Sequence, residues 1–290
     1  MTTLNFHSWW GRQTIEPQRT DLWQMGPLNL WVQHLAHRWT LSWTHSGDWL
    51  EPRVRIVPGV AAGELPPPNA TQVNFVLGSS PRSDLLFVPS LADRPLINRL
   101  ASPLHILPGE TASLYVLSPL RLRIEVAENS KVLQEIPTHR LSDTWFGPIS
   151  SPSSALATGP TPLSQKAPTG ELCYASSLPA FLELREVPIR LHCAISAISI
   201  RNAGKETLRV ERINVPLPRL SLFYSPRTGF WTDAFSLVCE GSDELASLKL
   251  ERQPPAEASP SQFVAGPRQA QPDSMAVIRA VGSLFRERHL

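Results

Sequence analysis

The densest group of polar and aromatic side chains in the sequence lies in the ten residues from His139 to Pro148. It holds two cations, an acid, two hydroxyls and two rings, and it lacks the alternation of an ordinary strand. In the simpler interpretation it is a structural corner, in which Arg140 pairs with Asp143 and Trp145 is anchored in the core. In the functional alternative, Arg140 binds an anion and Asp143 acts as a base or a metal ligand.

Two shorter motifs are candidates for the same place. The motif Gly170–Tyr174 follows a Ser/Pro-rich segment, and if that segment is an excursion from the fold, the motif returns close to Asp143 and Trp145. The charged pair Asp93-Arg94 stands between apolar runs and precedes a proline, which is typical of a salt-bridged turn. Polar density beside loops therefore predicts one binding site. Its members are Asp93, Arg94, Arg140, Asp143, Trp145, Glu171 and Tyr174.

Tryptophan is concentrated at the front of the chain, where seven of the nine lie within the first 49 residues. Trp39 and Trp43 share the phase of Leu41, so burial in a sheet explains them. Trp31 is out of phase with the apolar residues on either side, and we predict that its ring is exposed and contacts a partner.

The usual catalytic signatures are missing: the sequence has no G-x-S-x-G, GK[ST], G-x-G-x-x-G or H-E-x-x-H motif. His34 and His37 are close in sequence, but such a pair is a weak sign of a metal site. Cys173 and His139 have the residue types of a nucleophile and its base, with nothing to fix their approach. We predict no catalytic residue, no metal ion and no cofactor, and leave open whether the protein is an enzyme.

The elements that position these residues are predicted to be strands, because the dominant hydrophobic period is two. The clearest case is Leu120–Ala127, where apolar residues alternate with Arg121, Arg123 and Glu125. Short strands separated by turn signals are typical of sandwiches and barrels. A weak internal echo at an offset of about 95 residues fits two immunoglobulin-like units. Further alternating runs are Arg38–Thr44, Gln72–Leu77, Pro188–Arg201 and Leu220–Tyr224.

We therefore predict an all-β fold of two antiparallel, β-sandwich-like (immunoglobulin-like) halves, closed by a carboxy-terminal α-helix. The helix is expected because Ile278, Val281 and Phe285 fall on one helical face after a capping Asp273-Ser274. The expected segments are a Trp-rich β domain (1–148), a Ser/Pro-rich loop or linker (149–170), a second β domain (171–252), a Pro-rich irregular segment (253–273) and the helix (274–290).

Composition excludes several classes of protein. The 29 prolines among 290 residues argue against a helical bundle, and 42% hydrophobic residues argue against disorder. A net charge of +2 is too small to indicate nucleic-acid binding. The sequence contains neither a signal peptide nor a membrane-spanning run, so no membrane insertion is expected. The three widely spaced cysteines fit buried thiols in a cytoplasmic protein rather than disulfides.

Several strings together resemble the prokaryotic domain-of-unknown-function family 432. They are Met25–Trp31, Leu91–Pro95, Leu107–Glu110, Leu141–Gly147, Gly170–Tyr174, Asn214–Pro218 and Phe230–Thr232. The resemblance spans nearly the whole chain, and it makes Ser150–Thr169 an insertion in this member. The family has no established reaction, so no catalytic role carries over. Some members are encoded near small-conductance mechanosensitive channels, which implies a membrane protein as a partner.

The sequence thus favours a non-enzymatic binding or assembly module that contacts a protein partner. One alternative is a small-molecule enzyme with a polar pocket between the two β halves. Another is an accessory protein of a mechanosensitive channel.

Overall fold

The structure is a computed structural model and describes residues 9–35, 38–46, 48, 51–76, 84–147, 170–241, 245–271 and 276–282. Its elements are strands and short 3-10 helices, which confirms the predicted all-β class. The chain forms two compact units. Unit 1 comprises residues 1–91, 119–140 and 190–194, and unit 2 comprises residues 92–118, 141–189 and 195–290. No helix among the described residues is long and apolar enough to cross a bilayer.

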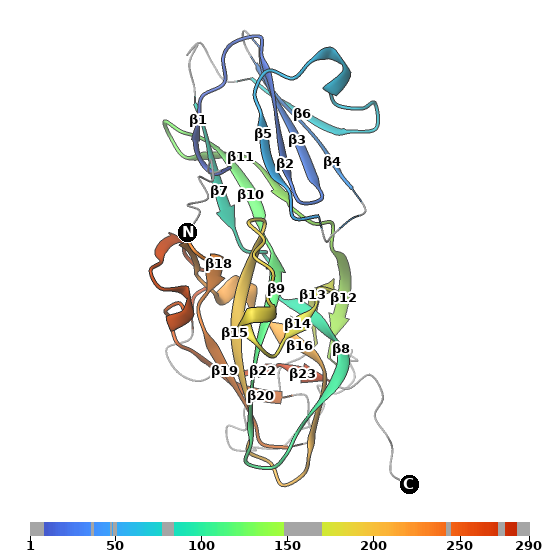
Figure 1. Ribbon diagram of the computed structural model, residues 1–290, viewed down its shortest axis with the longest axis vertical. Coiled ribbons are helices and arrows are strands. Elements are labelled where there is room, and N and C mark those ends of the chain that lie inside the picture. The colour runs from blue at the N-terminus through green and yellow to red at the C-terminus, as the bar shows by residue number, and fades with distance from the viewer. Residues whose placement is uncertain are drawn as a thin grey trace, which may run out of the picture. The chain divides into compact units, whose positions relative to one another are not determined.

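The described residues of unit 1 form two sheets, whose strands are labelled in Figure 1. The first has the order β1-β7-β10-β11, with β1 Gly11–Gln13, β7 Leu85–Ser90, β10 Arg121–Val126 and β11 Lys131–Pro137. The second has the order β5-β2-β3-β4-β6, with β2 Thr20–Met25, β3 Leu28–Leu35, β4 Arg38–His45, β5 Val54–Val57 and β6 Thr71–Phe75. The helix η1, Ala62–Glu64, lies between β5 and β6 in the chain.

The two sheets of unit 1 share an aromatic core. Trp23 of β2 and Phe87 of β7 are both almost fully buried, and their ring centroids are 5.0 Å apart. Aromatic pairs at this separation add to the free energy gained by burying their area. Trp39 and Leu41 are buried as the alternation predicted, whereas Trp43 is only half-buried.

Unit 2 also contains two sheets. The smaller has the order β12-β13-β8-β16-β23, with β8 Leu96–Ile106, β12 Ser142–Phe146, β13 Glu171–Ser176, β16 Leu208–Val215 and β23 Val281–Gly282. The larger has the path β21-β17-β18-β15-β19-β20-β22, and β9, which pairs with β14 and β15, joins it. Its strands are β9 Thr111–Pro119, β14 Ala180–Phe181, β15 Cys193–Asn202, β17 Leu222–Ser225, β18 Gly229–Thr232, β19 Phe235–Cys239, β20 Leu245–Leu250, β21 Gln262–Ala265 and β22 Ala276–Arg279. The described part of the unit also has the 3-10 helices η3 Leu184–Glu186, η4 Leu217–Arg219 and η5 Ala256–Ala258.

The predicted carboxy-terminal helix is wrong for the residues that the structure describes. Between 276 and 282 the chain forms β22, which pairs with β20, and β23, which pairs with β16. Burial alternates along β22, where Val277 is exposed and Ile278 is buried. β-branched residues favour a strand when two sheet edges are available for pairing. The helical spacing of Ile278 and Val281 was therefore a coincidence of short-range pattern.

Three other expectations from the sequence, for one strand and two irregular segments, have different outcomes. The alternating run from Leu120 is confirmed as β10. The segment 253–273, expected to be irregular, contains η5 and the strand β21, which pairs with β17. The predicted linker 149–170 lies outside the described residues except for Gly170.

Unit 2 buries a carboxylate that has incomplete hydrogen bonding. Asp233 is fully buried, and its Oδ2 accepts hydrogen bonds from the Ser221 amide at 2.6 Å and from Gln271 Nε2 at 3.1 Å. Its Oδ1 has no partner among the described residues. Burial raises the pKa of Asp233, and these two donors only partly offset the effect.

Replacing Asp233 with Asn should therefore stabilise the protein at neutral pH and change its pH dependence. A carboxyl whose pKa is raised by folding binds more protons in the folded state, so wild-type stability falls as pH rises from the ordinary Asp pKa through the raised one. Thermal unfolding from pH 3.5 to 7.5 should show this loss in the wild type and not in the variant. The expected gain at pH 7 is about 1 kcal/mol. The exposed Asp48→Asn is the control, and equal slopes in all three proteins would contradict the assignment.

Candidate functional site

The structure brings together most of the residues that the sequence nominated, through one antiparallel pair of strands. β12 and β13 run side by side, with Asp143 opposite Tyr174 and Trp145 opposite Leu172. The prediction that the Gly170–Tyr174 motif returns beside Asp143 and Trp145 is thereby confirmed. β13 also pairs in parallel with the start of β8, where Tyr174 is opposite Leu96.

The two faces of this hairpin differ sharply in exposure. Residues opposite one another in the ladder share a face, and residues two apart along a strand share it as well. One face therefore carries Asp143, Trp145, Leu172 and Tyr174. On it, the Trp145 side chain is 47% exposed and the Leu172 side chain 43% exposed. The other face carries Phe146 and Cys173, which form a buried cluster with Ile97.

An ordered network of charges and rings adjoins the exposed pair. Arg94 Nη1 lies 3.1 Å from Asp143 Oδ1, and its guanidinium carbon lies 5.3 Å from the centre of the Tyr174 ring. The Tyr174 hydroxyl donates a hydrogen bond to Asp93 Oδ1 at 3.0 Å. Asp93 and Arg94 sit on the bend before β8, which the pairing of β8 with β13 brings alongside. We call this surface the β12–β13 patch: Asp93, Arg94, Asp143, Trp145, Leu172 and Tyr174.

Three nominated residues lie elsewhere. Glu171 is on the inner face of β13, where it accepts a hydrogen bond from the buried Asn214 at 2.9 Å. Arg140 belongs to unit 1, whereas Asp143 belongs to unit 2 and pairs there with Arg94. Trp31 is only 7% exposed, so the prediction of an exposed ring is wrong. Its Nε1 donates a hydrogen bond to the Glu64 carbonyl at 2.7 Å. The turn at η1 therefore covers the face of β3 that carries Trp31, and the apolar pattern of β3 itself gives no sign of this contact.

The ends of the excursion between β12 and β13 lie against each other. Gly147 has φ +108, and a Cβ added there would come within 2.8 Å of the Gly170 Cα and 2.6 Å of the Arg279 side chain. Only glycine tolerates both this backbone conformation and this close approach. The strands are therefore held together on both sides of residues 148–169, whatever the length of the chain between them.

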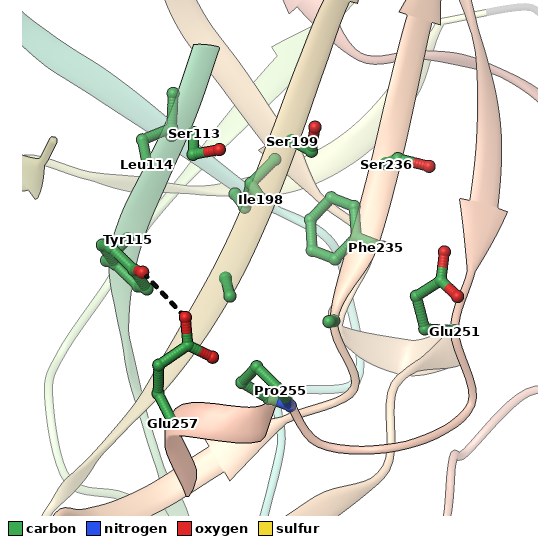
Figure 2. A pocket seen from close by; sticks show the side chains of 12 residues that line it. Ser113, Leu114, Tyr115, Ile198, Ser199, Phe235, Ser236, Glu251, Pro255 and Glu257 are labelled. Carbon is green, nitrogen blue, oxygen red and sulfur yellow. Dashed lines mark hydrogen bonds between the residues drawn. The ribbon is translucent and has the colours of Figure 1, made fainter. Parts of the chain in front are cut away.

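Unit 2 also has a pocket of about 190 Å³ (Figure 2). Tyr115 and Glu257 stand on one side of it, and the Tyr115 hydroxyl donates to Glu257 Oε1 at 3.3 Å. Burial, assisted by the charge of Glu257, raises the pKa of Tyr115 and keeps its phenol protonated. Sequence reasoning missed this pocket because its walls come from β9, β15, β19 and the η5 segment, which are far apart in sequence. Its other lining residues include Ser113, Ile198, Ser199, Phe235, Ser236 and Glu251.

Neither place holds an activated nucleophile among the described residues. The pocket lining includes serine hydroxyls but no histidine, cysteine or lysine to activate or replace them. Cys173 lies beneath the β12–β13 patch, where burial raises the pKa of its thiol to about 12. A protonated thiol is a poor nucleophile.

Among the described residues, one group has the composition and spacing to hold a metal ion: His139, His192 and Cys193 in unit 1. The closely spaced pair from the sequence, His34 and His37, is described only at His34. His34 Nδ1 is 2.9 Å from the Ile15 carbonyl oxygen and its ring stacks on Trp39, while His37 lies outside the described residues.

Comparison with known proteins places the chain in a family. A family model described as protein of unknown function (DUF432) matches residues 9–153 and 166–282. The chain belongs to the DUF432 family. No curated protein and no solved structure matches it. The unmatched residues 154–165 fall within the stretch that the resemblance marked as an insertion, so this DUF432 member carries extra chain between β12 and β13.

Removing the unmatched residues 154–165 should leave the protein folded. The ends of the excursion are already held by the β12–β13 ladder, and shortening a loop changes its closure entropy only slightly. The free energy of unfolding of the deletion variant should lie within about 1 kcal/mol of the wild type in urea titrations. A control deletion of the same length that removes β13 should abolish cooperative unfolding. A loss of several kcal/mol in the first variant would show that the insertion supports the fold.

Proposed function

We propose that the protein is a binding module that recognises a protein partner through the β12–β13 patch. The observation that carries the proposal is the exposed cross-strand pair of Trp145 and Leu172, which stands beside Arg94 and Tyr174 on a hydrogen-bonded ladder. Trp, Tyr and Arg are the residue types that dominate binding energy at protein interfaces. A ladder also holds the rings in place before binding, so little conformational entropy is lost on association.

The position of β12 suggests how the partner is bound. In the part of the chain that the structure describes, β12 is an edge strand that pairs with β13 alone. The free edge of a sheet can accept an extended segment of a partner as one more strand. Such a segment would place alternate side chains over the exposed face, where Trp145 and Leu172 offer an apolar contact.

The charges of the patch favour a cationic side chain near that apolar contact. The Asp143 side chain is 59% exposed although one of its oxygens binds Arg94, and Asp93 adds a second carboxylate. A lysine or arginine of the partner would therefore be attracted to Asp143 and would help to set the register of the added strand.

The family resemblance supports the choice of this surface. The strings Leu91–Pro95, Leu141–Gly147 and Gly170–Tyr174 carry part of that resemblance, and they supply every member of the patch. Because they are far apart in sequence, their convergence on one exposed surface fits a function shared by the family. The insertion in this member lies beyond the end of β12 and outside these strings.

A direct test uses variants that remove the apolar contact and keep strand propensity. In Trp145→Thr/Leu172→Thr, two exposed side chains are shortened by a residue that suits a strand. Leu107→Thr, which changes a 60% exposed leucine in unit 2, is the matched control. Each tagged protein is purified at native expression level from the soluble fraction and from detergent-solubilised membranes. The affinity of the recovered partner is then measured with purified components.

The wild type and Leu107→Thr should retain one stoichiometric partner, and the double variant should bind it at least about 30-fold more weakly. A channel protein recovered from the membrane fraction would identify the partner class that the family resemblance implied. Unchanged affinity in the double variant, with an unchanged thermal unfolding midpoint, would refute the proposed surface. Recovery of the wild type without a stoichiometric partner would refute the binding function.

A further inference from the structure

A compact group of two histidines and one cysteine lies in the interior of unit 1. One possible ligand atom from each of His139, His192 and Cys193 lies within 4.8 Å of the others. The three residues are 5%, 0% and 1% exposed. The two imidazole rings stack with their centroids 5.3 Å apart and an angle of 24° between their planes. A metal ion with ordinary bonds to N and S ligands holds such atoms roughly 3.5–4 Å apart, so only a small contraction is needed.

The ring of His192 is available to bind a ligand. Both of its ring nitrogens are buried, and neither has a hydrogen-bond partner among the described residues. The His192 ring is completely buried, and burial favours the neutral form of an imidazole. A neutral imidazole has one donor and one acceptor, and leaving both unsatisfied in the interior costs free energy. The lone pair of one nitrogen is available for coordination.

The backbone fixes the position of the His192 ring. The His192 carbonyl accepts hydrogen bonds from the Leu120 amide at 3.0 Å and from Thr138 Oγ1 at 3.1 Å. Gly26, with φ +55, lies directly against the ring, and a Cβ there would come within 2.6 Å of His192 Nε2. The ring is therefore packed from the side of the β2–β3 turn. Such support from surrounding groups is a common feature of preorganised metal sites.

We propose that His139, His192 and Cys193 bind one Cu⁺ ion. Thiolate is a soft ligand that selects Cu⁺, and imidazole is a good copper ligand. The charge of the site favours the monovalent ion, because Cu⁺ and one thiolate together are neutral. A Zn²⁺ ion with one thiolate would leave a net positive charge in the interior, which is costly. Zn²⁺ also prefers four ligands, whereas the described residues supply three.

The binding step is a simple exchange of a proton for a metal ion. The Cys193 S–H bond breaks, an Sγ–Cu bond forms, and one proton leaves for solvent for each Cu⁺ bound. The two imidazoles bind as neutral ligands, and copper remains Cu⁺ throughout. The site then carries no unsatisfied charge, and at least one nitrogen of His192 gains a partner.

The test is a competition titration of the purified full-length protein under anaerobic, reducing conditions. Cu⁺ is added in the presence of a chromophoric Cu⁺ chelator, and a parallel titration uses Zn²⁺ with a zinc indicator. Cys193→Ala removes the thiolate ligand. Cys239→Ala is the matched control, because Cys239 is an equally buried thiol in unit 2. Thermal unfolding shows whether each variant is folded.

The wild type and Cys239→Ala should bind one Cu⁺ per chain with equal affinity, and Cys193→Ala should bind it at least about 100-fold more weakly. The X-ray absorption spectrum of the copper-loaded wild type should show one sulfur and two nitrogen neighbours. This second measurement decides the matter if Cys193→Ala fails to fold. Equal affinity in Cys193→Ala, a sulfur-only copper environment, or tighter retention of Zn²⁺ than of Cu⁺ would each overturn the assignment.

Discussion

The antiparallel ladder between β12 and β13 is the interaction on which the candidate site depends. Its register decides two things together: which side chains enter the core of unit 2 and which remain outside. With the observed register Phe146 and Cys173 are buried, and Trp145 and Leu172 face outward. A slip of one residue would exchange the two sets, at the cost of burying charged Asp143. Core packing therefore enforces the composition of the exposed patch.

The same dependence on distant pairing holds for unit 1. Its sheets come from the first 91 residues and from 119–140, yet the unit also needs residues 190–194. That late segment supplies the His192 carbonyl, which binds Leu120 and Thr138, and the Leu191 carbonyl, which accepts from Trp9 Nε1. Such long-range closure slows folding, because loop-closure entropy is lost before the contacts form. Unit 1 is complete only after about two thirds of the chain has been synthesised.

Sequence patterns predicted local features well and long-range ones poorly. Period-two alternation identified β4, β6 and β10, because apolar residues alternate along each of these strands and that signal can be read locally. Trp31 was misjudged because the η1 turn, more than thirty residues away, covers it. The helix predicted near the end is wrong for a related reason: Ile278 is buried by strand pairing with β20, which no local period reveals.

The residues of the candidate site were predicted from polar density in the sequence. Only the register of the β12–β13 ladder shows that Tyr174 lies on the exposed face and Glu171 on the inner one. His192 and Cys193 attracted no attention as ligands because His139 lies more than fifty residues earlier in the chain.

The close approach of Gly147 to Gly170, at the two ends of the excursion, has a practical consequence. Gly147 and Gly170 touch, so the chain leaves and rejoins the sheet at what is geometrically a single point. A loop that leaves and rejoins a fold at one place can accept added sequence without disturbing the framework. A fluorescent protein or a cross-linking label placed between residues 154 and 165 would be tethered near Trp145 without altering the ladder. This family member therefore carries its own attachment point for a reporter beside the surface that we assign to its partner.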